Sequence, residues 1–218
     1  MPARVIWLAR HASRLDFADP GWAGRSPRAH DPPLSPAGHG EARAVARRLT
    51  REPIAHLFCS PFLRCVETAR PLARRLGLAI RIEPGLSEWL NREWFPDFPD
   101  VLPPAELARR APEIDPSYAA RGAARYGESG EEALLRSGRV ARRLAAEFAG
   151  DLLLVGHGAS VLGATLGLLG EASASAEGRA LPELPYACLT RLVQRGDAWR
   201  LDLRGDTAHL RDADAPSD

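Results

Sequence analysis

The chain has 218 residues, of which 45% are hydrophobic and 26% are charged, and its formal net charge at pH 7 is +1. This length and composition are enough for one compact domain with a sizeable core. The near-zero net charge gives no reason to expect nucleic acid or an acidic membrane surface as a partner. The chain contains arginine but no lysine. Arginine binds phosphate or carboxylate well, although a bias of genome composition is the simpler explanation for the lack of lysine.

The cysteines Cys59, Cys65 and Cys188 are too few and too irregularly spaced for a disulfide framework or a zinc site. The first apolar run, Val5 to Leu8, is too short for the core of a signal peptide, and no later run reaches membrane-spanning length. These observations predict a protein of the reducing cytoplasm with no membrane partner.

Three short apolar runs are predicted to be buried strands, at Val5 to Leu8, Ala55 to Cys59 and Leu152 to Val155. Each run leads into a helix-like segment, and this alternation is typical of a parallel sheet with helices on its faces. We therefore expect an α/β fold, a three-layer α/β/α sandwich with a mainly parallel central sheet.

Several residues mark where the helices should begin and end. Ser35-Pro36 and Ser60-Pro61 each place a hydroxyl at an expected N-cap and proline at the first helical position. Ser129 and Glu132 have the spacing of a capping box, and Gly150 is the expected C-cap of that helix. The apolar residues of the first and last of these helices recur at helical spacing, which predicts arginine on the solvent side of both.

Two regions depart from this alternation. Trp89 to Gly127 is rich in proline and aromatic residues without a clean period, and we expect it to be a lid-like subregion inserted in a single domain of residues 1–218. Cys188 to Gln194 and Trp199 to Leu203 flank Arg195-Gly196-Asp197, which predicts an antiparallel hairpin that extends the sheet.

Residues able to bind an anion follow each predicted strand directly: Arg10 to Arg14, Ser60 to Arg64, and Gly156 to Gly158. In open α/β sheets, ligands bind outside the carboxyl ends of the strands. If the three strands are parallel neighbours, these side chains converge on one crevice. Positioned cationic donors there would suit a phosphoryl group, which spreads its negative charge over several oxygens during transfer.

Each of the candidate residues has a role in such a crevice. Arg10, Arg14 and Arg64 would bind the phosphoryl oxygens, and His157 could donate a further hydrogen bond. His11 is the natural nucleophile, because neighbouring arginines disfavour its protonated form and leave a lone pair on the imidazole.

Hydrolysis of the resulting phosphohistidine needs a carboxylic acid that first protonates the leaving oxygen and later activates a water molecule. Glu88 is the first candidate for this acid and Glu128 is the second, with Glu83 and Glu93 as competitors. The remaining histidines have no metal-ligand spacing, so we expect neither a metal nor another cofactor; they are His30, His39, His56 and His209.

Four stretches resemble, in order, the motifs of the histidine phosphatase superfamily, also called phosphoglycerate mutase-like: Arg10 to Arg14, Leu34 to Gly38, Cys59 to Ala69, and Val155 to His157. The resemblance covers nearly the whole chain. Within the superfamily, Arg14, Ser60 to Ala69 and Pro84 to Trp89 are most similar to the phosphatase domain of the suppressors of T-cell receptor signalling.

This resemblance implies a phosphoglycerate mutase-like fold and a metal-independent phosphatase that is phosphorylated on His11. It also implies that the phosphoryl group is bound by Arg10, Arg14, Arg64 and His157, and that Glu88 is the acid. The chain departs from the family pattern at Ala12, where glycine is usual, and at Ser13, where glutamate is frequent. A methyl group at Ala12 is tolerable unless the turn needs a positive φ.

Other functions remain open at this point. The mutase branch has a phosphate-binding asparagine that this chain lacks, which favours hydrolysis over phosphoglycerate mutase-like transfer. The departures at Ala12 and Ser13 are also compatible with a catalytically weak phosphate-binding module. A dinucleotide site is disfavoured because the glycines of Gly156 to Gly163 are wrongly spaced. Cysteine phosphatase chemistry is excluded because each cysteine lies one residue too close to its following arginine, in the pairs Cys59 with Arg64 and Cys65 with Arg70.

The sequence does not identify the substrate or the oligomeric state. A small-molecule phosphate ester or a phosphoprotein fits the predicted site, and either a monomer or a homodimer is compatible with the sequence. Trp89 and Trp94 could line a site for an apolar leaving group, although aromatic clusters are more often core or lid packing.

Overall fold

The chain folds around a six-stranded sheet with the strand order β3-β2-β4-β1-β5-β6, in a computed structural model that describes residues 4–170 and 184–211. The strands are β1 (Val5–Arg10), β2 (Ile54–Cys59), β3 (Ile80–Ile82), β4 (Asp151–Gly156), β5 (Leu189–Arg195) and β6 (Ala198–Asp206). The pairs β3-β2, β2-β4 and β4-β1 are parallel, whereas β1-β5 and β5-β6 are antiparallel. The predicted mainly parallel sheet with a hairpin at one edge is therefore confirmed.

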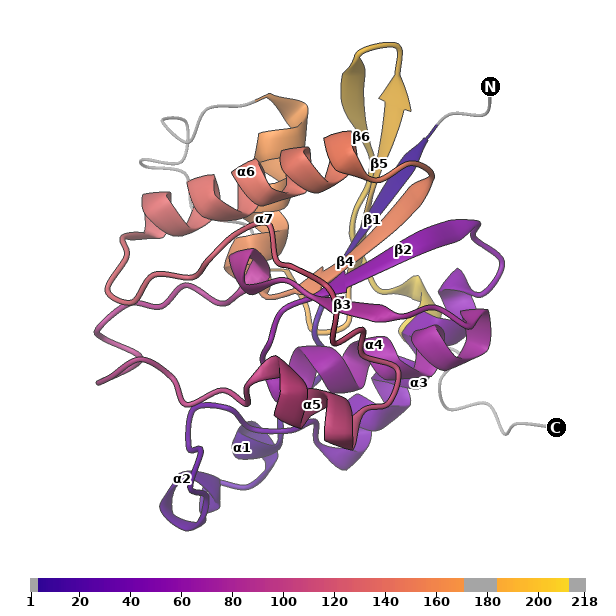
Figure 1. The fold of residues 1–218 in the computed structure, drawn as a ribbon. Coiled ribbons are helices and arrows are strands. Elements are labelled where there is room, and N and C mark those ends of the chain that lie inside the picture. Colours follow the sequence, from indigo (N-terminus) through magenta and orange to yellow (C-terminus); the bar gives the residue numbers. More distant parts are fainter. Residues whose placement is uncertain (1–3, 171–183, 212–218) are drawn as a thin grey trace, which may run out of the picture.

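Helices cover both faces of this sheet, as the predicted three-layer sandwich requires. Helices α6 and α7 lie on one face, and α3 and α4 lie on the other (Figure 1). The helices are α1 (Leu15–Ala18), α2 (Trp22–Arg25), α3 (Pro36–Leu49), α4 (Leu63–Leu76), α5 (Pro104–Arg110), α6 (Gly130–Glu147) and α7 (Gly158–Leu169), with 3-10 turns η1 (Pro84–Leu86) and η3 (Ala208–Leu210). No helix in these described ranges is long and apolar enough to cross a bilayer.

The strands are continuous apolar runs because their side chains alternate between two cores. On one side, Trp7 and Ala9 of β1 belong to the same buried cluster as Val45 of α3. On the other side, Ile6 and Leu8 belong to the cluster that contains residues of α6 and α7. A strand buried on both faces in this way holds its register firmly, because a slip by one residue would exchange the two sets.

The predicted helix starts are right in two cases and wrong in one. Ser35 caps α3, since its Oγ accepts a hydrogen bond from the Gly38 amide at 3.0 Å, and Ser129 forms a complete capping box with Glu132. Ser60 is not an N-cap, because α4 begins at Leu63 and the Ser60 hydroxyl lies instead against a histidine of another segment.

Two expectations for α6 are also wrong. The helix ends at Glu147 with Phe148 as its C-cap, and Gly150 lies in the turn beyond, with a φ of +83°. Arginine does not lie only on the solvent side of α6, because Arg136 is buried. The apolar pattern cannot distinguish a buried arginine that has partners from an exposed one.

Residues 89–127 contain α5 and several turns and pack into the domain. Leu90, Phe95 and Leu107 are buried in the cluster that also contains Trp7, and Ile114 forms an isolated parallel bridge with Ile80 of β3. The segment therefore shares the core of the sheet. Its lid-like behaviour remains a prediction.

The register of the central strands sets the three functional loops at one level. Arg10 at the end of β1 pairs with Gly156 at the end of β4, and Cys59 at the end of β2 pairs with Val155. The His11 amide continues the ladder by donating to the Gly156 carbonyl at 2.8 Å. The residues that follow the three strands consequently emerge side by side.

Candidate active site

His11 follows β1 directly and is buried. Its Nδ1 lies 2.8 Å from the carbonyl oxygen of Ala12, and because a carbonyl can only accept, Nδ1 must carry the proton. The lone pair of the neutral ring is therefore on Nε2. Burial, together with the nearby Arg64 guanidinium and His157, holds the pKa of His11 well below its usual range, so the ring is uncharged at neutral pH.

Arg64 lies in the first turn of α4 and is 1% exposed. Its Nε donates to His11 Nε2 at 3.3 Å, and its Nη2 lies 3.2 Å from His157 Nδ1. Among the described residues, its buried Nη1 has no hydrogen-bond partner. A buried guanidinium with an unpaired hydrogen-bond donor is well suited to bind an oxyanion.

His157 follows β4 and is the N-cap residue of α7. Its ring is fully buried and lies 5.1 Å from the ring of His11, centroid to centroid, at an interplanar angle of 67°. The Ser60 hydroxyl lies 2.9 Å from its Nε2, so Nδ1 is the nitrogen left for other partners. Burial lowers the pKa of His157 to about 4, although Glu88 opposes the shift.

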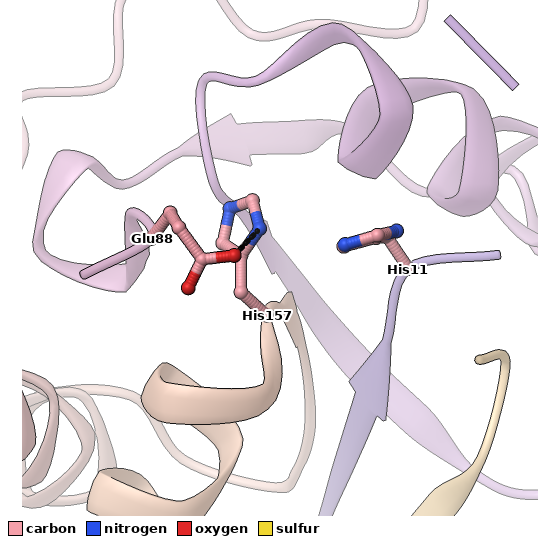
Figure 2. A group of neighbouring side chains, drawn as sticks. All are labelled: His11, Glu88 and His157. Atoms are coloured by element: carbon pink, nitrogen blue, oxygen red, sulfur yellow. Dashed lines mark ion pairs between the residues drawn. The ribbon is translucent and has the colours of Figure 1, made fainter. Parts of the chain in front are cut away.

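Glu88 enters the site from the loop after η1. Figure 2 shows its carboxylate directed at the ring of His157, with Oε2 3.4 Å from Nδ1. The same oxygen lies 3.9 Å from Arg64 Nη2. Burial alone would raise the pKa of the Glu88 carboxyl, but His157 and Arg64 outweigh it and lower this pKa to about 2, so the group is a carboxylate in the free protein.

Arg10 reaches the site from the end of β1, and Arg14 reaches it from the turn that follows. Both line a cavity of about 710 Å³ that Arg64 and Glu88 also line. The Arg14 guanidinium is paired with the carboxylate of Asp16, while Arg10 donates to the Leu184 carbonyl and stacks over the ring of Tyr186 at 4.1 Å. The structure thus brings together all the residues predicted as catalytic or phosphate-binding.

Glu128, the second candidate acid, has a different environment. It is buried, and its carboxylate forms a two-point pair with Arg136, at 2.5 Å from Nη2 and 2.9 Å from Nε. It is not among the residues that line the cavity. Arg136 also donates to the carbonyl oxygens of Gly85, Ser87 and Glu88. The pair therefore holds the loop that carries Glu88, and Glu88 is the carboxylate that faces His157.

The competing acids are also placed elsewhere. Glu83 is buried and accepts hydrogen bonds from the Tyr118 hydroxyl and from the Arg121 and Gly122 amides, whereas Glu93 is exposed. Of the acids considered, and within the part of the chain that the structure describes, Glu88 is therefore the one that lies beside the two histidines.

Three contributors were missed by the sequence analysis. Ser60 was assigned to a helix cap, but it contacts His157. The cap of α4 is supplied by Asp31, whose Oδ1 accepts from the Leu63 amide at 2.8 Å and whose pKa burial raises to about 6. Tyr186 lies 5.4 Å from the ring of His11. No local pattern links these residues to the site, because each acts on a residue far away in the chain.

The departures from the family pattern are accommodated. Among the described non-glycine residues only Ala187 has a positive φ, so the turn at Ala12 does not require glycine. The Ala12 amide donates to Thr68 Oγ1 at 3.0 Å, and the Ser13 hydroxyl donates to Glu41 at 2.7 Å. Neither residue therefore has a strained backbone, and both are hydrogen-bonded in this turn.

Within the described ranges, His11, Glu88 and His157 form the group whose ligand atoms lie close enough to hold a metal ion, within 4.8 Å of one another. The Arg64 guanidinium is hydrogen-bonded to His11 and lies within 4 Å of both His157 and Glu88. A permanent positive charge at this position opposes a cation and favours an anion. The donor set therefore fits a phosphoryl group better than a metal.

The sequence profile of the histidine phosphatase superfamily (branch 1) matches residues 6–207, and the chain belongs to this superfamily. Ecdysteroid-phosphate phosphatase of Drosophila melanogaster is 27% identical over 91% of this chain and 31% of its own length. Ubiquitin-associated and SH3 domain-containing protein B of Homo sapiens, a suppressor of T-cell receptor signalling, is 30% identical over 78% of this chain and 29% of its own length. The chain thus spans about a third of the length of these relatives, and the predicted similarity is confirmed.

Solved structures confirm the phosphoglycerate mutase-like fold. Ecdysone phosphate phosphatase from Bombyx mori, in complex with tungstate, superposes with a TM-score of 0.77 at 22% identity, over 94% of this chain and 93% of that one. Mycobacterial glucosyl-3-phosphoglycerate phosphatase, in complex with VO3, superposes with a TM-score of 0.68 at 25% identity, over 94% of this chain and 100% of that one.

Replacing Arg136 with methionine should lower the free energy of unfolding by about 3–5 kcal/mol, because Glu128 would be left buried without its partner. Urea unfolding measures this loss. Arg139→Met is the matched control, since Arg139 lies on the exposed side of the same helix. In the double variant with Glu128→Gln, part of the lost stability should return because no charge is stranded. Equal stability of the Arg136 and Arg139 variants would contradict the role given to the pair.

Proposed function

We propose that this chain is a metal-independent phosphomonoesterase that hydrolyses phosphate esters through a phosphohistidine on His11. The observation that carries the proposal is the state of His11: a neutral ring with its proton fixed on Nδ1 and its Nε2 lone pair bonded to the Arg64 guanidinium. A group that binds phosphoryl oxygens thus lies directly beside the nucleophilic atom.

In the first step, His11 Nε2 forms a bond to phosphorus while the bond between phosphorus and the ester oxygen breaks. The leaving oxygen takes the bonding electrons and a proton from Glu88. The phosphorylated ring carries a positive charge, and its Nδ1 proton remains bonded to the Ala12 carbonyl. Arg10, Arg14 and Arg64 stabilise the negative charge on the phosphoryl oxygens, and His157 Nδ1 can bond the phosphoryl group or Glu88.

In the second step, water attacks phosphorus and the bond to Nε2 breaks. Glu88, now a carboxylate, takes the proton from this water, and His11 returns to its neutral form. In the free protein the pKa of Glu88 is lowered to about 2, so the proton for the first step enters with the substrate. A phosphate monoester has a second pKa of about 6, and the charge of the bound phosphoryl group raises the pKa of the carboxyl beside it.

Two features of the whole molecule fit this proposal. The superfamily profile matches residues 6–207, which supports a single catalytic domain. Residues 89–127 would be a lid-like part of that domain. All three cysteines are buried free thiols, which suits the reducing cytoplasm. The substrate would be a phosphate ester of a small molecule or of a protein.

Rapid mixing with a phosphate ester labelled at phosphorus, followed by an alkaline quench, should trap label on His11. The His11→Ala variant should trap none and lose roughly a thousandfold or more in kcat, because the nucleophile is gone. Circular dichroism should show that the fold is kept. His39→Ala, an exposed histidine of α3, is the control and should behave as wild type. Label found on another residue, or turnover that survives in His11→Ala, would refute the proposal. Transfer of the label to an added alcohol in preference to water would favour the mutase alternative.

Replacing Glu88 with glutamine should slow esters of poor leaving groups much more than esters of good ones, because only the former need a proton on the leaving oxygen. The measurement compares kcat/KM for benzyl phosphate and 4-nitrophenyl phosphate, because this quantity reports the step in which the leaving group departs and excludes the later attack by water. Glu93→Gln, a nearby exposed acid, is the control. If both esters slowed by the same factor, Glu88 would not be the acid.

A further inference from the structure

The cavity beside His11 has two chemically different kinds of lining. Apart from the predicted phosphate-binding residues, the described lining is mainly apolar and aromatic. The main apolar side chains are Phe17, Trp89, Trp94, Leu162, Leu184 and Tyr186. They come from four separate segments of the chain, so the apolar lining is built by the fold rather than by one local cluster. A volume of about 710 Å³ is ample for the alcohol part of a medium-sized organic phosphate.

Aromatic rings lead outward from the nucleophile along one wall. Tyr186 lies 5.4 Å from the ring of His11, and Phe17 lies 6.4 Å from the ring of Tyr186. The indole rings of Trp89 and Trp94 also line the cavity and meet edge to face at 5.2 Å. An alcohol attached to a phosphoryl group at His11 would therefore contact apolar surface as it extends from the reacting atom.

Two of these rings are unusually exposed for their size. Phe17 is 68% exposed and Trp94 is 53% exposed, so neither contributes its full apolar surface to the core. Exposed large apolar side chains at the edge of a cavity mark a place where a ligand can cover them. Phe98 is equally exposed, at 54%, but it lines a different pocket and serves as a comparison.

The same lining offers little to a second charged group on the substrate. Outside the phosphate-binding set and Glu88, its titratable described residues are Asp16, His30 and Tyr186, and none of these is a permanent cation. Asp16 is paired with Arg14, and His30 packs edge to face on Phe95. Among the described lining residues, a substrate carboxylate would find no cationic partner outside the phosphate-binding set to offset the water that it gives up, which is costly.

We propose that this cavity selects phosphomonoesters of bulky apolar alcohols, alkyl or aryl, over phosphates of hydroxy acids and sugars. The inference rests on the proposed phosphatase function and adds the chemical class of the substrate. Burial of the alcohol against Phe17, Trp94 and Tyr186 supplies the binding free energy that distinguishes this class.

The test uses ethyl, butyl and hexyl phosphates, whose leaving groups are equally poor, so that only apolar surface changes along the series. We expect kcat/KM to rise roughly two- to fourfold for each added methylene. O-Phosphoserine and glycerol phosphate should lie at or below ethyl phosphate. A flat series, or a preference for the charged and hydroxylated esters, would overturn the inference.

Variants locate the effect within the cavity. Trp94→Ala and Phe17→Ala should each reduce the advantage of hexyl over ethyl phosphate, taken as a ratio within each variant, by roughly fivefold or more. Phe98→Ala should keep the full advantage. An advantage that is reduced equally by all three variants, or by none of them, would count against this cavity as the binding site.

Binding measurements separate this inference from the proposed function. Alkylphosphonates of the same chain lengths lack the ester bond that is cleaved, and calorimetry gives their affinity whether or not the protein turns over. Affinity that rises with chain length in a protein without turnover would support the apolar subsite and refute the phosphatase. Turnover together with an affinity that is independent of chain length would support the phosphatase and refute the apolar subsite.

Discussion

A buried guanidinium between two uncharged imidazoles is the constraint on which the rest of the structure depends. Arg64 keeps its charge at any physiological pH, so burying it has to be offset by hydrogen bonds and by nearby negative charge. His11 Nε2 accepts from it, and Glu88 lies 3.9 Å away. Burial, together with this charge, lowers the pKa of both histidines below the usual range and so keeps them uncharged. In the proposed mechanism, a neutral nucleophile and a bound phosphoryl group both result from the position of Arg64. The ends of β1, β2 and β4, which lie at one level, make this position possible.

Buried polar residues outside the cavity hold this arrangement in place. Asp31 accepts the hydrogen bond from the Leu63 amide at the start of α4 and so fixes the turn that carries Arg64. Arg136 donates to three carbonyls of the loop that carries Glu88, with Glu128 as its counter-ion. In both cases a buried charge is used to position a neighbouring segment, and its loss would disturb the site without removing any reacting group. The two supports come from different faces of the sheet, so the site is held from both sides.

Much of the fold and the site could be predicted because the information is local or follows from a general rule of α/β sheets. The apolar runs of β1, β2 and β4 are continuous, and residues able to bind an anion follow each strand directly. Because the carboxyl ends of parallel strands lie at one edge of a sheet, the convergence of these residues could be predicted. The three-residue strand β3 has too little sequence to stand out. Ser60, Asp31 and Tyr186 act on residues distant in sequence, and a serine before proline has the same local pattern whether it caps a helix or contacts His157. Arg136 was expected in solvent because the sequence does not show that it pairs with Glu128. That pairing depends on the packing of α6 against the loop that carries Glu88.

The most direct test of this account is a crystal structure of the protein with vanadate, which adopts the five-coordinate geometry of phosphoryl transfer. The account predicts vanadium bonded to Nε2 of His11, with its oxygens bonded to Arg64 and within hydrogen-bond reach of His157. Vanadate bound through another side chain, or held elsewhere while the His11 ring turns its Nδ1 toward Arg64, would contradict it.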